Sequence, residues 1–130
     1  MARRIFRISG EHGPHARALI DYDLKYKLAI CAERMCRGAR NEHMMVVAER
    51  ELAMRNADLE QCEGTALRAL EFVEEHGGVG HCKVMRAYYI DGLTNEEAGR
   101  ACAYTSQGIK CIRARELTRL DEWDKKHGRI

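Results

Sequence analysis

The residues between Thr105 and Leu120 carry the side chains best suited to binding a polyanion. This segment contains four cations and one acid, namely Lys110, Arg113, Arg115, Arg119 and Glu116. Lysine and arginine bind phosphate oxygens, and short polar side chains at the start of a helix can hydrogen-bond to base edges. Ser106 and Gln107 are such side chains, and they directly follow Thr105. The segment therefore predicts a helix that presents a DNA-binding face.

Two threonines predict where the helices of this region begin. Thr94 is a favourable N-cap, and Glu97 three residues later completes a capping box. Thr105 is the expected N-cap of the next helix. The free backbone N–H groups of a helix that starts at Thr94 can also bind a phosphate. We therefore expect a short helix that ends around residues 102–104, a turn, and a second helix after Thr105.

Apolar spacing divides the second of these helices into two sides. The core side is expected to contain Ile109, Ile112, Leu117 and Leu120. The opposite side carries Gln107, Lys110, Cys111, Ala114 and Thr118, with Arg115 and Arg119 beside it. Arg113 lies near the edge of the core, where it could contact a phosphate or pair with Glu97. A preceding helix from about His81 to Ile90 completes the unit, and Gly99 lets a neighbouring helix approach closely.

The order of these residues resembles region 4 of bacterial sigma factors, the sigma-70 region 4. It is most similar to the sigma-region-4-like domains of phage regulators of the ArpU and RinA kind. The resemblance is carried by an aromatic-rich helix, a capped helix and the recognition helix. In this chain they read Arg86-Ala87-Tyr88-Tyr89-Ile90, then Leu93-Thr94-x-Glu96-Glu97-Ala98-Gly99, then Thr105-x-x-x-Ile109-x-x-Ile112-x-Ala114-Arg115-x-Leu117-x-x-Leu120.

The resemblance implies a helix-turn-helix regulator of transcription, of phage or mobile-element origin, that binds double-stranded DNA. By position, it implies that Ser106, Gln107, Lys110 and Cys111 face the bases. Sigma factors commonly have longer charged or amide side chains where this chain has Ser106, Gly108 and Cys111, which puts recognition of the usual promoter element in doubt. RNA polymerase is a further candidate partner. The candidate DNA-binding residues are Thr94, Thr105, Ser106, Gln107, Lys110, Cys111, Arg113, Arg115 and Arg119.

Residues 15–76 are expected to form two long helices that serve as a dimerisation segment. The first runs from about His15 to Arg37 and repeats Leu24, Leu28, Cys31 and Met35 at helical spacing. The second runs from about Asn41 to His76, with a kink near residues 62–65. Its apolar residues fall seven apart, as in a coiled coil: Met45, Leu52, Leu59, Ala66 and Val73, with Ala48, Cys62 and Ala69 beside them. A homodimer is the preferred interpretation, and a monomeric helical hairpin is the alternative.

Breaks in the pattern predict the remaining boundaries. Residues 1–14 are expected to form a flexible basic arm, either lying in a minor groove or remaining disordered. Residues 77–80 are rich in glycine and separate the long helices from the sigma-region-4-like domain at 81–126. Charge changes sign along the chain, with nine Lys/Arg against four Asp/Glu in residues 1–40, three against nine in 41–78, and ten against seven in 79–130.

Composition indicates a folded all-α protein. The 130 residues are 45% hydrophobic and 32% charged, and they include a single proline. A run of about 18 apolar residues is absent, and the basic N-terminus lacks the apolar stretch of a signal peptide, so we expect a cytoplasmic protein that does not enter membranes. The six cysteines are expected to be reduced and mostly buried.

Enzymatic activity is not expected, because the sequence contains no nucleophile–base pair, phosphate-binding loop or paired carboxylates. His76, His81 and Cys82 are the densest group of metal-ligand types, but they lack a fourth ligand, so neither a metal nor a cofactor is expected. The rival hypothesis is a small phage-type protein that binds and inhibits a host protein through its acidic central helix. Steep salt dependence would distinguish DNA binding from this alternative.

Overall fold

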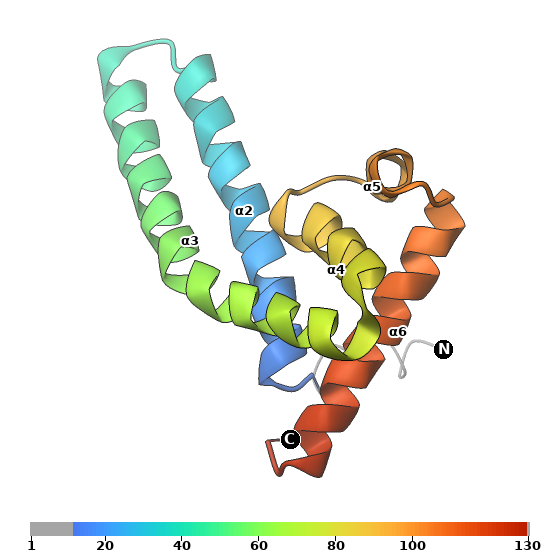
Figure 1. Cartoon of the computed structure of the whole chain (residues 1–130). Coiled ribbons are helices and arrows are strands. Elements are labelled where there is room, and N and C mark those ends of the chain that lie inside the picture. The colour runs from blue at the N-terminus through green and yellow to red at the C-terminus, as the bar shows by residue number, and fades with distance from the viewer. Residues whose placement is uncertain (1–11, 130) are drawn as a thin grey trace, which may run out of the picture.

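The structure is a computed structural model that describes residues 12–129, and over this range the protein is all-α without a strand. Two long antiparallel helices form a hairpin that projects from the rest of the molecule (Figure 1). The other helices gather beside the base of the hairpin. The elements are α2 (Pro14–Gly38), α3 (Glu42–Gly77), α4 (Val79–Met85), the π-helical turn η1 (Arg86–Ile90), α5 (Asn95–Cys102) and α6 (Ser106–Lys126).

The two long helices begin and end within about two residues of their predicted limits. Pro14 occupies the first turn of α2, where its missing N–H costs nothing. Asn41 caps α3 by accepting a hydrogen bond from the Met44 amide at 2.8 Å. α3 bends at about its middle (Figure 1), in agreement with the kink predicted near residues 62–65.

The larger hydrophobic core continues across the predicted domain boundary at residues 77–80. Leu19 of α2, Val73 of α3, Met85 of α4 and Leu120 of α6 are fully buried in one cluster. The hairpin base and the C-terminal helices therefore share a core, and the glycine-rich segment is only a break between α3 and α4. Hydrophobic burial of this kind couples the position of α6 to that of the hairpin.

The predicted apolar stripe of α2 is exposed at both of its ends. Leu24 is 55% exposed and Met35 is 48% exposed. The buried face of the hairpin instead consists largely of alanines, among them Ala29, Ala32 and Ala48. Small side chains let two helix backbones approach closely, whereas long side chains on that face would hold them apart. Helical spacing thus identified a face of α2 that is exposed at both ends, whereas alanines form the face that packs within the hairpin.

The N-terminus of α2 is held by two carboxylates of α6, which corrects the predicted extent of the flexible arm. Asp121 accepts hydrogen bonds from the Gly13 amide at 2.8 Å and lies 2.7 Å from His12 Nδ1. Asp124 accepts a bond from the His15 amide at 3.0 Å and lies 2.8 Å from His15 Nδ1. Carboxylates are favourable at a helix N-terminus because free N–H groups point toward them. Residues 1–11 of the predicted arm lie outside the described residues.

Candidate nucleic-acid interface

A small second core holds α5 and α6 against α4 and η1. Val84, Ala87, Ala98, Ile109 and Ile112 are buried together, and Leu93 and Cys102 pack against them. The predicted core side of α6 is confirmed at Ile109, Ile112 and Leu120, whereas Leu117 is half-buried. Glu116, one residue before it, is instead fully buried.

Both predicted caps are present, and each threonine hydroxyl is used within the chain. Thr94 Oγ1 accepts a hydrogen bond from the Glu97 amide at 3.1 Å, and the Thr94 amide donates to the Glu97 carboxylate at 2.9 Å. Thr105 Oγ1 accepts from the Gly108 amide at 2.9 Å. The hydrogen bond from the Thr94 amide, followed by the effect of the Thr94 hydroxyl, holds the pKa of Glu97 below its usual value. A carboxylate thus occupies the N-terminus of α5, where a phosphate was expected.

Two residues make the turn between α5 and α6 tight: Ala103 by its left-handed backbone and Gly99 by its lack of a side chain. Ala103 has left-handed backbone angles, φ 62° and ψ 43°, and the Tyr104 amide donates to the Gly99 carbonyl at 2.9 Å. A Cβ added at Gly99 would lie 2.5 Å from the Tyr104 carbonyl oxygen. Gly99 is therefore required by the close approach of this turn and of the start of α6, whose Ser106 amide nitrogen would lie 3.5 Å from that Cβ.

One side of α6 is exposed over its first four turns. Helix geometry, with about 100° between successive residues, places Gln107, Cys111, Ala114 and Thr118 along its centre. These four side chains, like Lys110 and Arg115 on the two flanks, are exposed. The contact of Gln107 Nε2 with Cys111 Sγ at 3.6 Å links two side chains of this face. We call these six residues the outer face of α6.

The outer face of α6 is cationic, and within residues 12–129 its charges pair with no other group. Among the described residues, Lys110 and Arg115 have neither a hydrogen-bonding nor an ion-pairing partner within the protein. Its six residues include no acid. Ser106 is half-buried at the edge of this face, so its predicted position among the base-facing residues is not central.

Arg113 points toward the core, and its partners differ from the predicted ones. Its Nη1 donates to Asn95 Oδ1 at 3.1 Å, and its Nε lies 3.4 Å from the Tyr89 hydroxyl. The guanidinium also lies 3.5 Å from the ring centroid of Tyr88, a cation–π contact. Burial raises the pKa of Tyr89. Neither the proposed pairing with Glu97 nor a phosphate-binding role fits this geometry, because Arg113 joins η1, α5 and α6.

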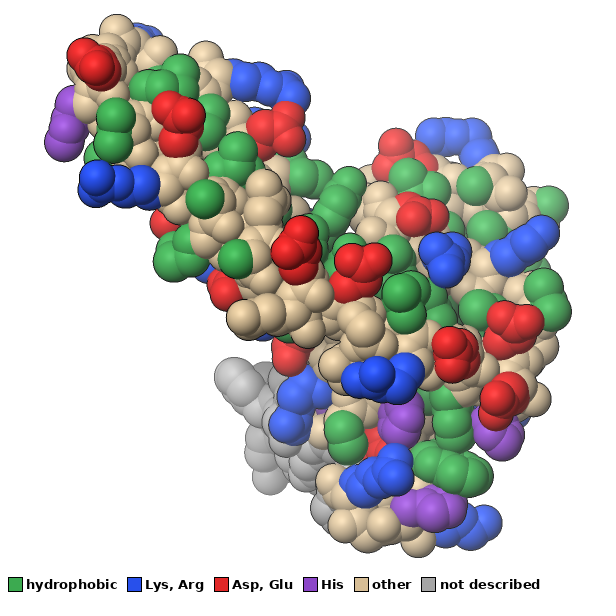
Figure 2. All heavy atoms as spheres, turned by 60° about the vertical axis from the view of Figure 1, so that its left-hand side comes forward, with side chains coloured by type: hydrophobic (Ala, Val, Ile, Leu, Met, Phe, Trp, Pro, Cys, Tyr) green, Lys and Arg blue, Asp and Glu red, His purple; other side chains and the backbone are tan. Residues whose placement is uncertain are grey.

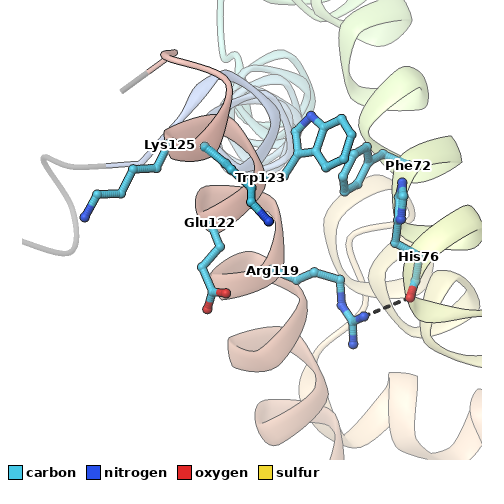
Figure 3. Close-up of a pocket in the computed structure, with 7 residues that line it drawn as sticks. Phe72, His76, Arg119, Glu122, Trp123 and Lys125 are labelled. Carbon is cyan, nitrogen blue, oxygen red and sulfur yellow. Dashed lines mark hydrogen bonds between the residues drawn. The ribbon is translucent and has the colours of Figure 1, made fainter.

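Arg119 also serves the fold, on the side of α6 that faces α3. Its Nη1 donates to the His76 carbonyl at 2.8 Å (Figure 3), and its Nε lies 3.2 Å from Glu116 Oε1. The other oxygen of Glu116 lies 2.7 Å from His81 Nδ1. A buried carboxylate needs such partners. A Cβ at Gly77 would lie 2.5 Å from Glu116 Oε1, so that glycine makes room for the carboxylate.

The far end of α6 is fixed by aromatic packing around a surface hollow. The hollow has a volume of about 480 Å³ and is bordered by Phe72, His76 and Trp123 (Figure 3). The Phe72 and Trp123 ring centroids lie 4.9 Å apart in an edge-to-face arrangement, and His127 stacks on Trp123 at 3.9 Å. Together with Asp121 and Asp124, this packing sets the direction of α6 relative to the hairpin.

The structure also bears on metal binding, cysteine burial and membrane insertion. Within residues 12–129, no three His, Cys, Asp or Glu side chains gather as a metal site would require. None of the six cysteines is fully buried or in a disulfide, and Cys31 and Cys111 are exposed, so the predicted burial was wrong. Among the described helices, none has the length and apolar character to cross a membrane.

Comparison with known proteins adds no relative, because no family model, curated protein or solved structure matches the chain.

Proposed function

We propose that this protein is a DNA-binding transcriptional regulator that binds duplex DNA with the outer face of α6. The observation that carries this proposal is the division of α6 into a buried side and an exposed cationic side. Ile109 and Ile112 fasten the helix to the small core, while Lys110 and Arg115 remain available to an anion. A helix of this width fits the major groove of B-form DNA.

The chemistry of the outer face divides between bases and phosphates. Gln107, in the first turn, can form two hydrogen bonds with the edge of an adenine. Cys111 and Ala114 are small, so the helix can lie close to the floor of the groove. Lys110 and Arg115 flank this line on opposite sides, where the phosphates of the groove walls would lie. The DNA-binding set is thus narrower than predicted, because Arg113, Arg119 and the two threonine hydroxyls hold the fold.

The resemblance to sigma region 4 suggests where such a regulator would act and which partners it would bind. A regulator of phage or mobile-element type would act in the cytoplasm and could also contact RNA polymerase. A homodimer would place two copies of α6 on related half-sites, with their spacing set by the protein. The function is binding rather than catalysis.

Inhibition of a host protein is the second candidate function, and the surface of α3 supports it. This helix exposes acids along its second half that have no ion-pairing partner among the described residues, including Glu60, Glu63, Glu71 and Glu74. A basic protein surface could bind them. DNA cannot, because like charges repel.

Selection of bound fragments from a random duplex pool tests the proposal. The wild type is expected to enrich a sequence motif, and Gln107→Ala should relax preference at one base position. Lys110→Ala should weaken binding to all sequences alike. Lys126→Ala, at the other end of α6, is the matched control and should leave both motif and affinity unchanged. The proposal fails if neither Gln107→Ala nor Lys110→Ala alters the selected pool or the affinity.

A further inference from the structure

Exposed apolar side chains are concentrated on the projecting half of the hairpin, which we call the arm (residues 24–54). Of the nine large hydrophobic residues exposed in the described chain, seven lie on the arm, and Val79 and Tyr104 are the others. The seven are Leu24, Met35, Met44, Met45, Val46, Val47 and Met54. Figure 2 shows hydrophobic side chains along the arm with charged ones among them. Apolar groups gathered in this way mark a surface that binds another protein surface.

Part of this surface forms a hollow between the two helices of the arm. It has a volume of about 410 Å³, and its wall contains Met35, Met44 and Val47. Gly38 also borders it, and a Cβ at that position would meet nothing within 4 Å. The hollow therefore has space for apolar side chains from another molecule. Methionine side chains adapt their shape to such a contact.

The charges on the arm favour a second copy of the same chain as the partner. Arg34, Arg40 and Arg50 have no ion-pairing partner among the described residues, and neither do Glu42 and Glu49. A partner of one charge sign would be repelled by part of this set. In a two-fold dimer, both signs occur on both surfaces, so the cations of each copy can face the acids of the other.

We infer that two copies of this chain associate through their arms and form a four-helix bundle. The arm can supply the roughly 20–30 residues that each side of a standard interface contributes. This surface shares Met45 with the predicted coiled-coil seam of α3 but not the later part of that seam, because Ala66, Ala69 and Val73 are buried within their own chain. The inference deepens the proposed function by naming the surface that pairs two DNA-binding units.

Measuring the mass of the full-length protein across a dilution series, without DNA, tests this inference. Sedimentation equilibrium should give twice the 14.9 kDa chain mass at high concentration. Val47→Glu should weaken the dimer by at least about 100-fold, because each substitution occurs twice in a two-fold interface. Val79→Glu makes the same change at an exposed valine outside the arm and should leave the dimer intact. Both positions are exposed, and circular dichroism verifies that each variant is folded.

A charge-exchange experiment tests whether the partner is a second copy in the stated arrangement. The variant Arg34→Glu/Arg40→Glu and the variant Glu42→Arg/Glu49→Arg should each dimerise more weakly than the wild type. Their mixture should form heterodimers at least about tenfold more tightly than either variant alone, because opposite charges face each other again.

Three results would overturn the inference. They are a wild type that remains monomeric at every concentration, equal effects of Val47→Glu and Val79→Glu, and a mixture that associates no better than its components. None of these results depends on DNA. Loss of DNA binding by a protein that still dimerises would instead count against the proposed function alone.

Discussion

The large apolar side chains that the arm presents and the side chains of the outer face of α6 are both exposed, yet they differ in chemistry. The arm leaves methionines and valines in water, whereas α6 leaves an amide, small side chains and two cations. Apolar surface gains free energy only when water is removed from it. A cationic face is well hydrated until a polyanion displaces its counterions. This difference is the basis for proposing assembly through the arm and nucleic-acid binding through α6.

The α5–α6 turn beneath the outer face of α6 is more tightly constrained than the exposed middle of α3, and alanine substitution of glycine measures this directly. Gly99→Ala should lower the free energy of unfolding by about 3 kcal/mol, because its Cβ would overlap the Tyr104 carbonyl. Gly64→Ala in α3 should raise it by about 0.5–1 kcal/mol, because the site is exposed and open. Urea denaturation gives both values. Similar effects at the two sites would contradict the tight turn.

Arg113 stabilises the fold, and this distinguishes it from the exposed cations that are proposed to bind DNA. Arg113→Ala should lower the free energy of unfolding by about 2 kcal/mol, since it removes the contacts with Tyr88, Tyr89 and Asn95. Lys110→Ala, at an exposed position on the outer face of α6, should change it by less than about 0.5 kcal/mol. Thermal denaturation provides the comparison. A stable Arg113→Ala protein with impaired DNA binding would place this residue in the interface after all.

The N-caps of α5 and of α3 should contribute equally to stability. Thr94→Ala at α5 and Asn41→Ala at α3 should each cost about 1 kcal/mol of stability, because each removes a side-chain acceptor from a helix N-terminus. Urea denaturation at neutral pH measures both. A negligible loss at Thr94 would show that the capping box does not stabilise α5.

The smallest expected effect is the pH dependence of the α5 cap, which the arm does not share. Since the pKa of Glu97 is lowered in the fold, its carboxylate stabilises the protein above the usual pKa of 4.5. This contribution is lost as the pH falls through the lowered pKa. Glu97→Gln should therefore be less stable than the wild type near neutral pH, with the difference narrowing in acid. NMR titration of the carboxyl group checks the direction of the shift.

Sequence reasoning succeeded where partners are local and failed where they are distant. Thr94 and Glu97 are three residues apart, so their capping box is visible in the sequence. Arg119 donates a hydrogen bond to a backbone carbonyl 43 positions away, and Glu116 pairs with His81, which lies 35 positions away. Nothing in the spacing of either residue specifies such a partner. For the same reason, the sequence could not show that two of the four predicted DNA-binding cations, Arg113 and Arg119, hold the fold instead.

The hairpin shows a second limit of the sequence. Periodicity indicates that Leu24 and Met35 share a face, but it does not say which face another helix covers. The alanines of α2 and α3 decided that question, because they allow closer packing than the longer side chains. When one face of a helix carries small residues and another carries bulky apolar residues, the small face can pack against a neighbouring helix. The bulky face then remains exposed and available for a contact with another molecule.

The salt dependence of binding to a duplex tests the central claim most directly. The logarithm of the affinity should fall linearly with the logarithm of the salt concentration, and Lys110→Ala should reduce the slope by about 0.9, the value of one phosphate contact. Lys126→Ala should leave the slope unchanged. Binding that does not respond to salt, or a slope that is the same in the wild type and Lys110→Ala, would contradict the assignment of the outer face of α6 to DNA.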